Sequence, residues 1–370
     1  MKSRPKPFVR IVAALLTGVA LPVAAARPAV ATPREQQWYL DRINVPQAHT
    51  VSLGEGVLIG MFLAGVDTSR PELAGRVRPG KYVGNRARVK DRPPGIDGGP
   101  SDADTGLAGL VVAAGGAGPL GVAPRAEIQP ISHPVGEKRV SAALRWLVDH
   151  GAKVIDMSGG FSITDDVTAI DGIRYALAND VVVIMDARSA DRLPDTATTG
   201  VLVVGGINEE GRRGSFGRID LAAPGATLGL TGLTNFNTTT GYGPLPVPGD
   251  LQASAIVAGV AALVRSRHPD LNAASVIDRL LNTARDAGPA GPDDTYGAGV
   301  VDAGAAVLSD RPPVTVNPLG DPGPPRESLL DRVGGGVAFA VAGLCCLLVV
   351  VAVVGVLLVL VRARRRHRAG

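Results

Sequence analysis

The sequence predicts an α/β protein built on a mostly parallel sheet of about seven strands, with helices covering both faces. Short, continuous apolar runs alternate along the chain with segments in which apolar residues recur at helical spacing. A continuous apolar run is typical of a strand that is buried on both faces, as strands of parallel sheets are. The 370 residues suffice for one large α/β domain with appendages at its two ends.

The expected strands and helices follow one another through the middle of the chain. Strands are expected at 56–66, 127–131, 153–157, 181–185 and 201–206, and helices at 137–150, 164–179, 249–267 and 273–283. The helix 249–267 is rich in alanine and glycine, so neighbouring backbones can approach it closely. We therefore expect it to be the central core helix.

One polar region, 77–105, interrupts this pattern and is expected to be a long surface loop. It carries six cations: Arg78, Lys81, Arg86, Arg88, Lys90 and Arg92. Solvated charges on a loop are the simplest interpretation, and an acidic partner or an anionic lipid is the alternative.

The two ends of the chain have the composition of targeting segments. Residues 1–31 combine an N-terminal region with four cations, an apolar run and a cleavage site of small residues, which predicts a secretory signal peptide. Residues 333–361 contain no charge and would measure about 44 Å as a helix, enough to span a bilayer. An uncleaved anchor at the first end and a buried core helix at the second are the alternatives.

The charges that follow this span predict its orientation. The tail 362–370 holds five arginines, and such basic flanks stay in the cytoplasm. We therefore expect a single-pass protein of the cell membrane, with residues 32–309 as the extracytoplasmic domain. The intervening segment 310–332 contains six prolines and is expected to be a semi-rigid, extended spacer.

Charge and cysteine usage exclude two classes of function. The formal net charge of +4 includes five cations of the signal peptide and five of the tail, so the rest of the chain carries −6. That charge gives no support to nucleic-acid binding. The two cysteines, Cys345 and Cys346, both lie in the predicted span, so the domain has no disulfide and no thiol chemistry.

Several motifs resemble those of the subtilisin-like serine proteases, over roughly residues 34–308. The matching residues are Gly56, Val57, Gly65, Val66 and Asp67 in the first strand, Thr105, Ala108 and Gly109 at a helix entrance, and Val257, Ala258 and Gly259 in the central helix. Segments 215–225 and 296–307 also match family motifs. The segment 34–40 with the first strand is most similar to the mycosins, a membrane-anchored branch associated with type VII secretion in actinobacteria.

Aligned without gaps, the resemblance implies that all three catalytic positions have lost their reactive side chains. Leu63 stands at the aspartate, Ala103 at the histidine and Leu251 at the nucleophilic serine. None of these side chains can attack a carbonyl or move a proton. The family's oxyanion donor falls near Ser189, and Ser254 is interpreted as a small packing residue. The resemblance therefore implies a pseudoprotease and not an enzyme.

The resemblance also implies a peptide-binding edge. Ser158, Gly159 and Gly160 follow a buried strand and are similar to the segment with which the family pairs substrate backbone. The five histidines are scattered and show no metal-ligand spacing, so we expect neither a metal nor a cofactor.

Taken with the resemblance, these features imply a structural or stabilising component of a type VII secretion membrane complex. Its expected partners are the membrane, proteins of that complex and extended peptide segments. Two alternatives remain open: an active serine-type endopeptidase that uses non-standard residues, and a peptide-binding decoy that does not cleave.

Overall fold

The computed structural model describes residues 37–93, 99–116, 118–132, 137–159, 167–213, 217–225 and 247–324. Its strands are β1 Leu58–Phe62, β2 Lys81–Val83, β3 Val89–Asp91, β4 Glu127–Ile131, β5 Ala152–Asp156, β6 Val182–Asp186, β7 Leu202–Ile207 and β8 Leu221–Pro224. Its helices are α1 Trp38–Arg42, α2 Val45–Ala48, α3 Asp102–Val112, α4 Glu137–Asp149, α5 Val167–Ala178, α6 Ala187–Ala190, α7 Asp195–Thr198, α8 Gly249–Arg267, α9 Ala273–Asn282 and α10 Ala303–Leu308. Two short 3₁₀ helices, η1 Pro71–Leu73 and η2 Asn85–Ala87, complete the elements.

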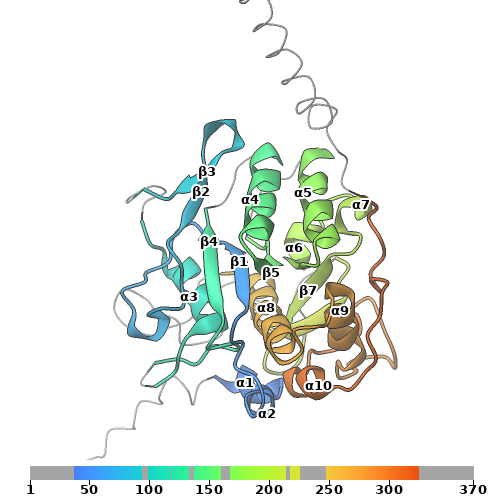
Figure 1. Cartoon of the computed structure of the whole chain (residues 1–370). Coiled ribbons are helices and arrows are strands. Elements are labelled where there is room, and N and C mark those ends of the chain that lie inside the picture. The colour runs from blue at the N-terminus through green and yellow to red at the C-terminus, as the bar shows by residue number, and fades with distance from the viewer. Residues whose placement is uncertain are drawn as a thin grey trace, which may run out of the picture.

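One eight-stranded sheet runs through the body, in the order β3-β2-β4-β1-β5-β6-β7-β8 (Figure 1). Every neighbouring pair is parallel except β2 and β3. The prediction of an α/β fold with a mostly parallel sheet is confirmed, with one strand more than expected.

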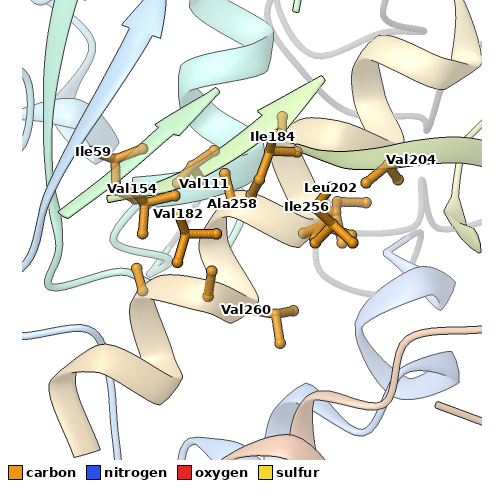
Figure 2. Close-up of a cluster of buried hydrophobic side chains, with 14 of the residues drawn as sticks. Ile59, Val111, Val154, Val182, Ile184, Leu202, Val204, Ile256, Ala258 and Val260 are labelled. Carbon is orange, nitrogen blue, oxygen red and sulfur yellow. The ribbon is translucent and has the colours of Figure 1, made fainter. Parts of the chain in front are cut away.

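Side-chain alternation assigns the helices to the two faces of the sheet. Ile59 of β1 packs in the cluster that contains Val111 of α3 and Ala258 of α8 (Figure 2). The next residue, Gly60, points the opposite way, and a Cβ atom there would lie 2.8 Å from Leu147 of α4. Helices α3 and α8 therefore cover one face, and α4 with its neighbour α5 covers the other.

The expected central helix is the core of the domain. Helix α8 has the predicted bounds and packs against β5, β6, β7 and β8 as well as α3. Its side-chain neighbours in Figure 2 come from alternate positions of three strands: Val154, Val182, Ile184, Leu202 and Val204. Burial of such side chains, at about 25 cal/mol per Å² of apolar surface, is the main source of the domain's stability.

The polar region 77–105 is more ordered than a surface loop, and that expectation was wrong. Strands β2 and β3 form an antiparallel hairpin, and Lys81 of β2 pairs in parallel with Ile131 at the end of β4. These short strands were not predicted from the sequence, because their cations interrupt the apolar pattern by which strands are recognised. The hairpin adds two strands to one edge of the sheet.

The proline-rich segment, expected over 310–332 to be a semi-rigid, extended spacer, contacts the domain in the part that the structure describes, which ends at residue 324. Asn272 and Ser275 of α9 both donate to the carbonyl oxygen of Val314, and Ser275 Oγ accepts from the Val314 N–H. Farther along, the N–H of Gly200 donates to Leu319 O. We call residues 309–323 the C-terminal strap, because they bind along the surface of the domain.

Several predictions concern residues that the structure does not describe. The signal peptide at 1–31, the membrane span at 333–361 and the basic tail at 362–370 all lie outside the described ranges. Among the described helices, none combines the length and the apolar character needed to cross a bilayer.

Candidate active site

The carboxyl edge of the sheet is where the candidate site lies, because several element ends converge there. In open parallel sheets, binding sites form at the carboxyl ends of the strands. Strands β5 and β6 each end there in an aspartate, Asp156 and Asp186. The first turn of α8 lies at the same edge, since the Gly206 N–H, near the end of β7, donates to Asp250 Oδ1 at 2.8 Å.

Two of the three predicted catalytic positions lie at adjoining element ends. Leu63 follows β1 and is buried, and Ala103, in the first turn of α3, packs against the core. Oδ2 of Asp104 joins the two ends, because it accepts the backbone N–H groups of Ala64 and Gly65 at 2.8 and 2.9 Å. This edge therefore has a fixed shape, although neither aliphatic side chain can act in acid–base chemistry.

The third position, Leu251, lies in the first turn of α8 and is half-buried. Its carbonyl oxygen accepts a hydrogen bond from Ser254 Oγ at 3.0 Å. The assignment of Leu63, Ala103 and Leu251 to the family's catalytic positions rests on motif alignment and stays a prediction.

Side-chain alternation directs both strand-end aspartates toward α8. Asp156 has the same parity as Val154, and Asp186 the same parity as Ile184, both of which face that helix. In the register of the sheet, Asp156 pairs with Ile184, so Asp186 lies two residues farther along its strand. Both carboxyl groups are buried, with exposed fractions of 2% and 0%.

A chain of hydrogen bonds connects these carboxyl groups with three serines. Ser254 Oγ lies 3.4 Å from Asp156 Oδ2, and the N–H of Ser158 donates to Asp156 Oδ1 at 3.0 Å. The Asp186 N–H donates to Ser158 Oγ at 2.9 Å, and the Ser189 N–H donates to Asp186 Oδ1 at 3.0 Å. We call these five residues the Ser–Asp cluster.

Burial sets the protonation of the Ser–Asp cluster. It raises the pKa of Asp156 to about 7, against the opposing hydrogen bonds from Ser158 and Ser254, and the nearby Asp186 raises it further. Burial also raises the pKa of Asp186, assisted by the charge of Asp250. The Asp186 Oδ2 atom is buried and has no hydrogen-bond partner in the described part of the chain. Near neutral pH, Asp156 can therefore gain or release a proton.

The structure shows where the other predicted site residues lie but does not test their roles. The backbone N–H of Ser158 is bound to Asp156, and that of Gly159 lowers the pKa of Asp186. Gly160 lies outside the described residues. Ser189, the predicted oxyanion donor, is buried, and its backbone N–H donates to Asp186, whose side chain caps α6. The peptide-binding and oxyanion roles stay predictions.

The two buried aspartates were not among the residues predicted from the sequence, and Ser254 was interpreted there as a packing residue. The available signal was the position of Asp156, a carboxylate at the end of an apolar strand and two residues before Ser158. A charge at the end of a buried strand needs partners, and such sites have perturbed pKa values. Among the described residues no group of acidic, histidine or cysteine side chains is arranged to hold a metal ion.

Comparison with known proteins places this geometry in a family. The subtilase family model, peptidase family S8, matches residues 54–299. Mycosin-1 of Mycobacterium tuberculosis is 33% identical over 221 residues, which cover 54% of this chain and 48% of the relative. Mycosin-4 of the same organism is 32% identical over 286 residues, which cover 65% of this chain and 61% of the relative. The chain thus spans between about half and three-fifths of these two relatives.

Solved structures share the fold. Fervidolysin from Fervidobacterium pennivorans, described as a keratinolytic enzyme related to subtilisin, matches with a TM-score of 0.62 and 26% identity, covering 76% of this chain and 48% of its own. A serine protease, MycP1, described as an essential component of the type VII (ESX-1) secretion system, matches with a TM-score of 0.60 and 25% identity. That match covers 76% of this chain and 91% of MycP1.

These findings contradict the expectation that the chain is not an enzyme, because the family is a peptidase family and the matched relatives are named as proteases or enzymes. The expectation rested mainly on the residues at the three aligned catalytic positions. Aliphatic residues at those positions show that these three side chains are not catalytic. They do not exclude catalysis by other hydroxyl and carboxyl groups that the fold brings to the same edge of the sheet. The matching family model and the mycosin and fervidolysin relatives lead to one conclusion: the chain belongs to the subtilase family.

Proposed function

We propose that this protein is a mycosin-like, serine-type endopeptidase that acts on extended peptide segments beside a type VII secretion membrane complex. Membership of the subtilase family and the named activities of its relatives support the peptidase reaction. The observation that carries the proposal is the pair formed by Ser254 and Asp156, an oxygen nucleophile beside a carboxyl group whose pKa is about 7.

The pair supplies the two elements that peptide cleavage requires of the protein. Ser254 Oγ adds to the scissile carbonyl carbon while its proton passes to Asp156 Oδ2. The tetrahedral intermediate then breaks its C–N bond, and Asp156 returns the proton to the departing amine. Water hydrolyses the resulting ester with Asp156 again as the base, which restores Ser254. A base with a pKa near the working pH is suited to both proton transfers.

The position of the cluster also favours stabilisation of negative charge. Asp156 contacts Ser254 in the second turn of the 19-residue helix α8, close to the helix end at which the dipole stabilises anions. The same field would stabilise the oxyanion of the tetrahedral intermediate.

Access to the pair requires movement, because Ser254 and Asp156 have exposed fractions of 0% and 2%. The proposal therefore includes a displacement of the first turn of α8 when a peptide binds. Ser254 is bonded to that turn through the carbonyl oxygen of Leu251, so the displacement would also release the serine hydroxyl.

The cellular setting is part of the proposal. The sequence features at 1–31 and 333–361 support secretion of the domain and a single membrane anchor, with the domain outside and the basic tail inside. The resemblance to mycosins, and the description of MycP1 as a component of type VII secretion, support a partner among the membrane proteins of such a system.

Peptide turnover by the purified full chain tests the peptidase proposal. A mixture of unstructured peptides is incubated with the wild type, with Ser254→Ala and with a control, Ser266→Ala. Ser266 lies on the same helix, and its hydroxyl donates to Glu55 O on the surface. We expect cleavage by the wild type and the control, and none by Ser254→Ala at unchanged helical content. Absence of cleavage by the wild type, or full cleavage by Ser254→Ala, would overturn the proposal.

The secretion partner is tested separately, by solubilising native membranes in mild detergent and isolating the tagged full chain. We expect the membrane proteins of a type VII secretion complex to co-purify with it. Their absence would refute the partner assignment and leave the peptidase assay unaffected.

A further inference from the structure

The hairpin of β2 and β3 projects beyond the carboxyl edge of the sheet. Lys81, the first residue of β2, is already level with Ile131, the last residue of β4. Because β2 runs parallel to β4, its remaining residues and η2 lie past the end of that strand. Figure 1 shows the hairpin at the top of the body.

The two faces of the hairpin differ in their contacts. Val83 is buried toward the body, and the Lys81 ammonium lies 5.5 Å from the ring centroid of Trp146 on α4. On the opposite face, Tyr82 pairs across the strands with Lys90, and Arg88 lies two residues before Lys90. This outer face therefore combines an aromatic side chain with cations.

Three of the hairpin's cations are exposed and unpaired. Arg86, Arg88 and Lys90 are all exposed, and within the described part of the chain no acidic group forms an ion pair with them. By contrast, Arg78 is paired with Glu127 and Lys81 with Asp91. Protection of an edge strand from pairing accounts for a lysine within β3. It does not account for the two arginines, which precede that strand.

The tip holds Arg86 and its neighbour Ala87 in a costly backbone conformation, whereas Arg88 is extended. Arg86 and Ala87 have φ values of 63° and 53°, in the left-handed region that residues with a Cβ avoid. Backbone strain of this kind persists where the surrounding structure imposes it and often accompanies binding sites. Here it occurs in η2, the turn that connects β2 to β3 and contains Arg86.

The C-terminal strap keeps this end of the body close to a membrane if the predicted anchor is present. The strap is bonded to the domain as far as Leu319, and the described chain ends at residue 324. Residues 325–332, eight in number, then separate the domain from the predicted span, and they reach at most about 28 Å. In Figure 1 the red end of the described chain lies beside α7, in the same upper half of the body as the hairpin.

We infer that the outer face of the β2–β3 hairpin binds anionic phospholipid headgroups of the membrane in which the chain is anchored. Arginine and lysine side chains are attracted to anionic headgroups, and tyrosine is favoured at the membrane–water interface. The interaction goes beyond the peptidase function. It depends on the predicted membrane anchor and not on peptidase activity. It would fix the orientation of the Ser–Asp cluster relative to the membrane.

Hydrogen exchange of the full chain in nanodiscs tests this inference. One set of nanodiscs contains phosphatidylcholine alone, and the other contains added phosphatidylglycerol. We expect the amides of 84–88 to exchange more slowly in the anionic nanodiscs, by about tenfold or more, and the difference to vanish at high salt. The triple variant Arg86→Gln, Arg88→Gln and Lys90→Gln should lose the effect, since three cations near an anionic surface shift the docking equilibrium by about a hundredfold.

A matched control removes the same charge elsewhere on the body: Arg192→Gln, Arg212→Gln and Arg267→Gln, all at exposed positions. The control should keep the protection by anionic lipid. Equal exchange in the two lipids, protection that survives in the hairpin variant, or equal loss in the control would overturn the inference. If the chain does not insert into nanodiscs, the predicted anchor is wrong and the lipid-binding inference fails with it. The result of the peptidase assay would be unaffected.

Discussion

Ser254 Oγ lies 3.4 Å from Asp156 Oδ2, although the two residues are 98 positions apart in the chain. The contact joins the N-terminal part of the core helix α8 to the end of β5, where the sheet alternation turns Asp156 toward that helix. When Asp156 is protonated, its Oδ2–H can donate to Ser254, which in turn donates to Leu251 O. When Asp156 is ionised, the serine proton can turn toward the carboxylate. The protonation state of this one carboxyl group therefore determines which of these hydrogen bonds forms.

Asp156 should make the protein less stable at neutral and alkaline pH. Its folded pKa of about 7 lies above the ordinary value of 3.8, so the folded state holds its proton more tightly than the unfolded state. The stabilisation is complete below about pH 4 and is lost as pH rises through about 7. At about 1.4 kcal/mol per pKa unit, the loss is on the order of several kcal/mol.

Asp156→Asn should flatten this dependence and make the protein more stable than the wild type at pH 8. The amide oxygen can still accept from the N–H of Ser158, and the amide N–H₂ can donate to Ser254. Urea unfolding of both proteins between pH 4 and pH 8 measures the effect. Parallel curves for the two proteins would contradict the assigned pKa.

Ser158→Ala should move the pH dependence of peptide cleavage upward. The hydrogen bonds from Ser158 lower the pKa of Asp156, so removing its hydroxyl should raise the pH at which the base ionises. We expect cleavage by the wild type to rise with pH and level off above about 7, and the variant to require a higher pH. The profile of kcat/KM against pH measures the shift, and a midpoint unchanged by the substitution would argue against Asp156 as the base.

Asp104→Ala should destabilise the domain by about 2–4 kcal/mol, because it leaves two backbone N–H groups without their acceptor. The control is Asp102→Ala in the same turn of α3. Asp102 is partly exposed, so its loss should cost a few tenths of a kcal/mol through the helix dipole. Chemical denaturation gives both values, and similar losses for the two variants would show that Asp104 does not fix the end of β1.

Ser275→Ala should loosen the C-terminal strap by about 1–2 kcal/mol, since its hydroxyl both donates to and accepts from the backbone of Val314. The body of the domain should stay folded. Limited proteolysis should then cut within 309–323 sooner than in the wild type, whereas Ser266→Ala should leave the rate unchanged. Equal cleavage rates in all three proteins would mean that the strap does not depend on this contact.

The sequence predicted the parts of the fold that follow from periodicity. Apolar runs located β1, β4, β5, β6 and β7, and small residues identified α8 with its observed bounds. Asn272 caps α9 by accepting from the Ser275 N–H at 2.7 Å. These features depend on local spacing, which a single sequence records.

The contacts between distant segments were not predictable in the same way. The β2–β3 hairpin is stabilised by pairing with β4 and by packing on Trp146, and the strap by α9, all remote in sequence. The candidate site shows the same limit. Asp156, Asp186 and Ser254 come from three elements, and only the register of the sheet shows that they converge. Motif alignment identified residues at the carboxyl edge of the sheet, but the positions that it assigned to catalysis were Leu63, Ala103 and Leu251.

The residue that reacts with a fluorophosphonate probe tests the central claim most directly. Such probes form a stable phosphonyl ester with a serine that a neighbouring base has activated. After the full chain has reacted, mass spectrometry of its peptides identifies the modified residue. We predict one adduct on Ser254, formed faster as pH rises through about 7 and absent from Asp156→Asn. No adduct, or an adduct on another serine, would contradict the assignment of Ser254 and Asp156 as the catalytic pair.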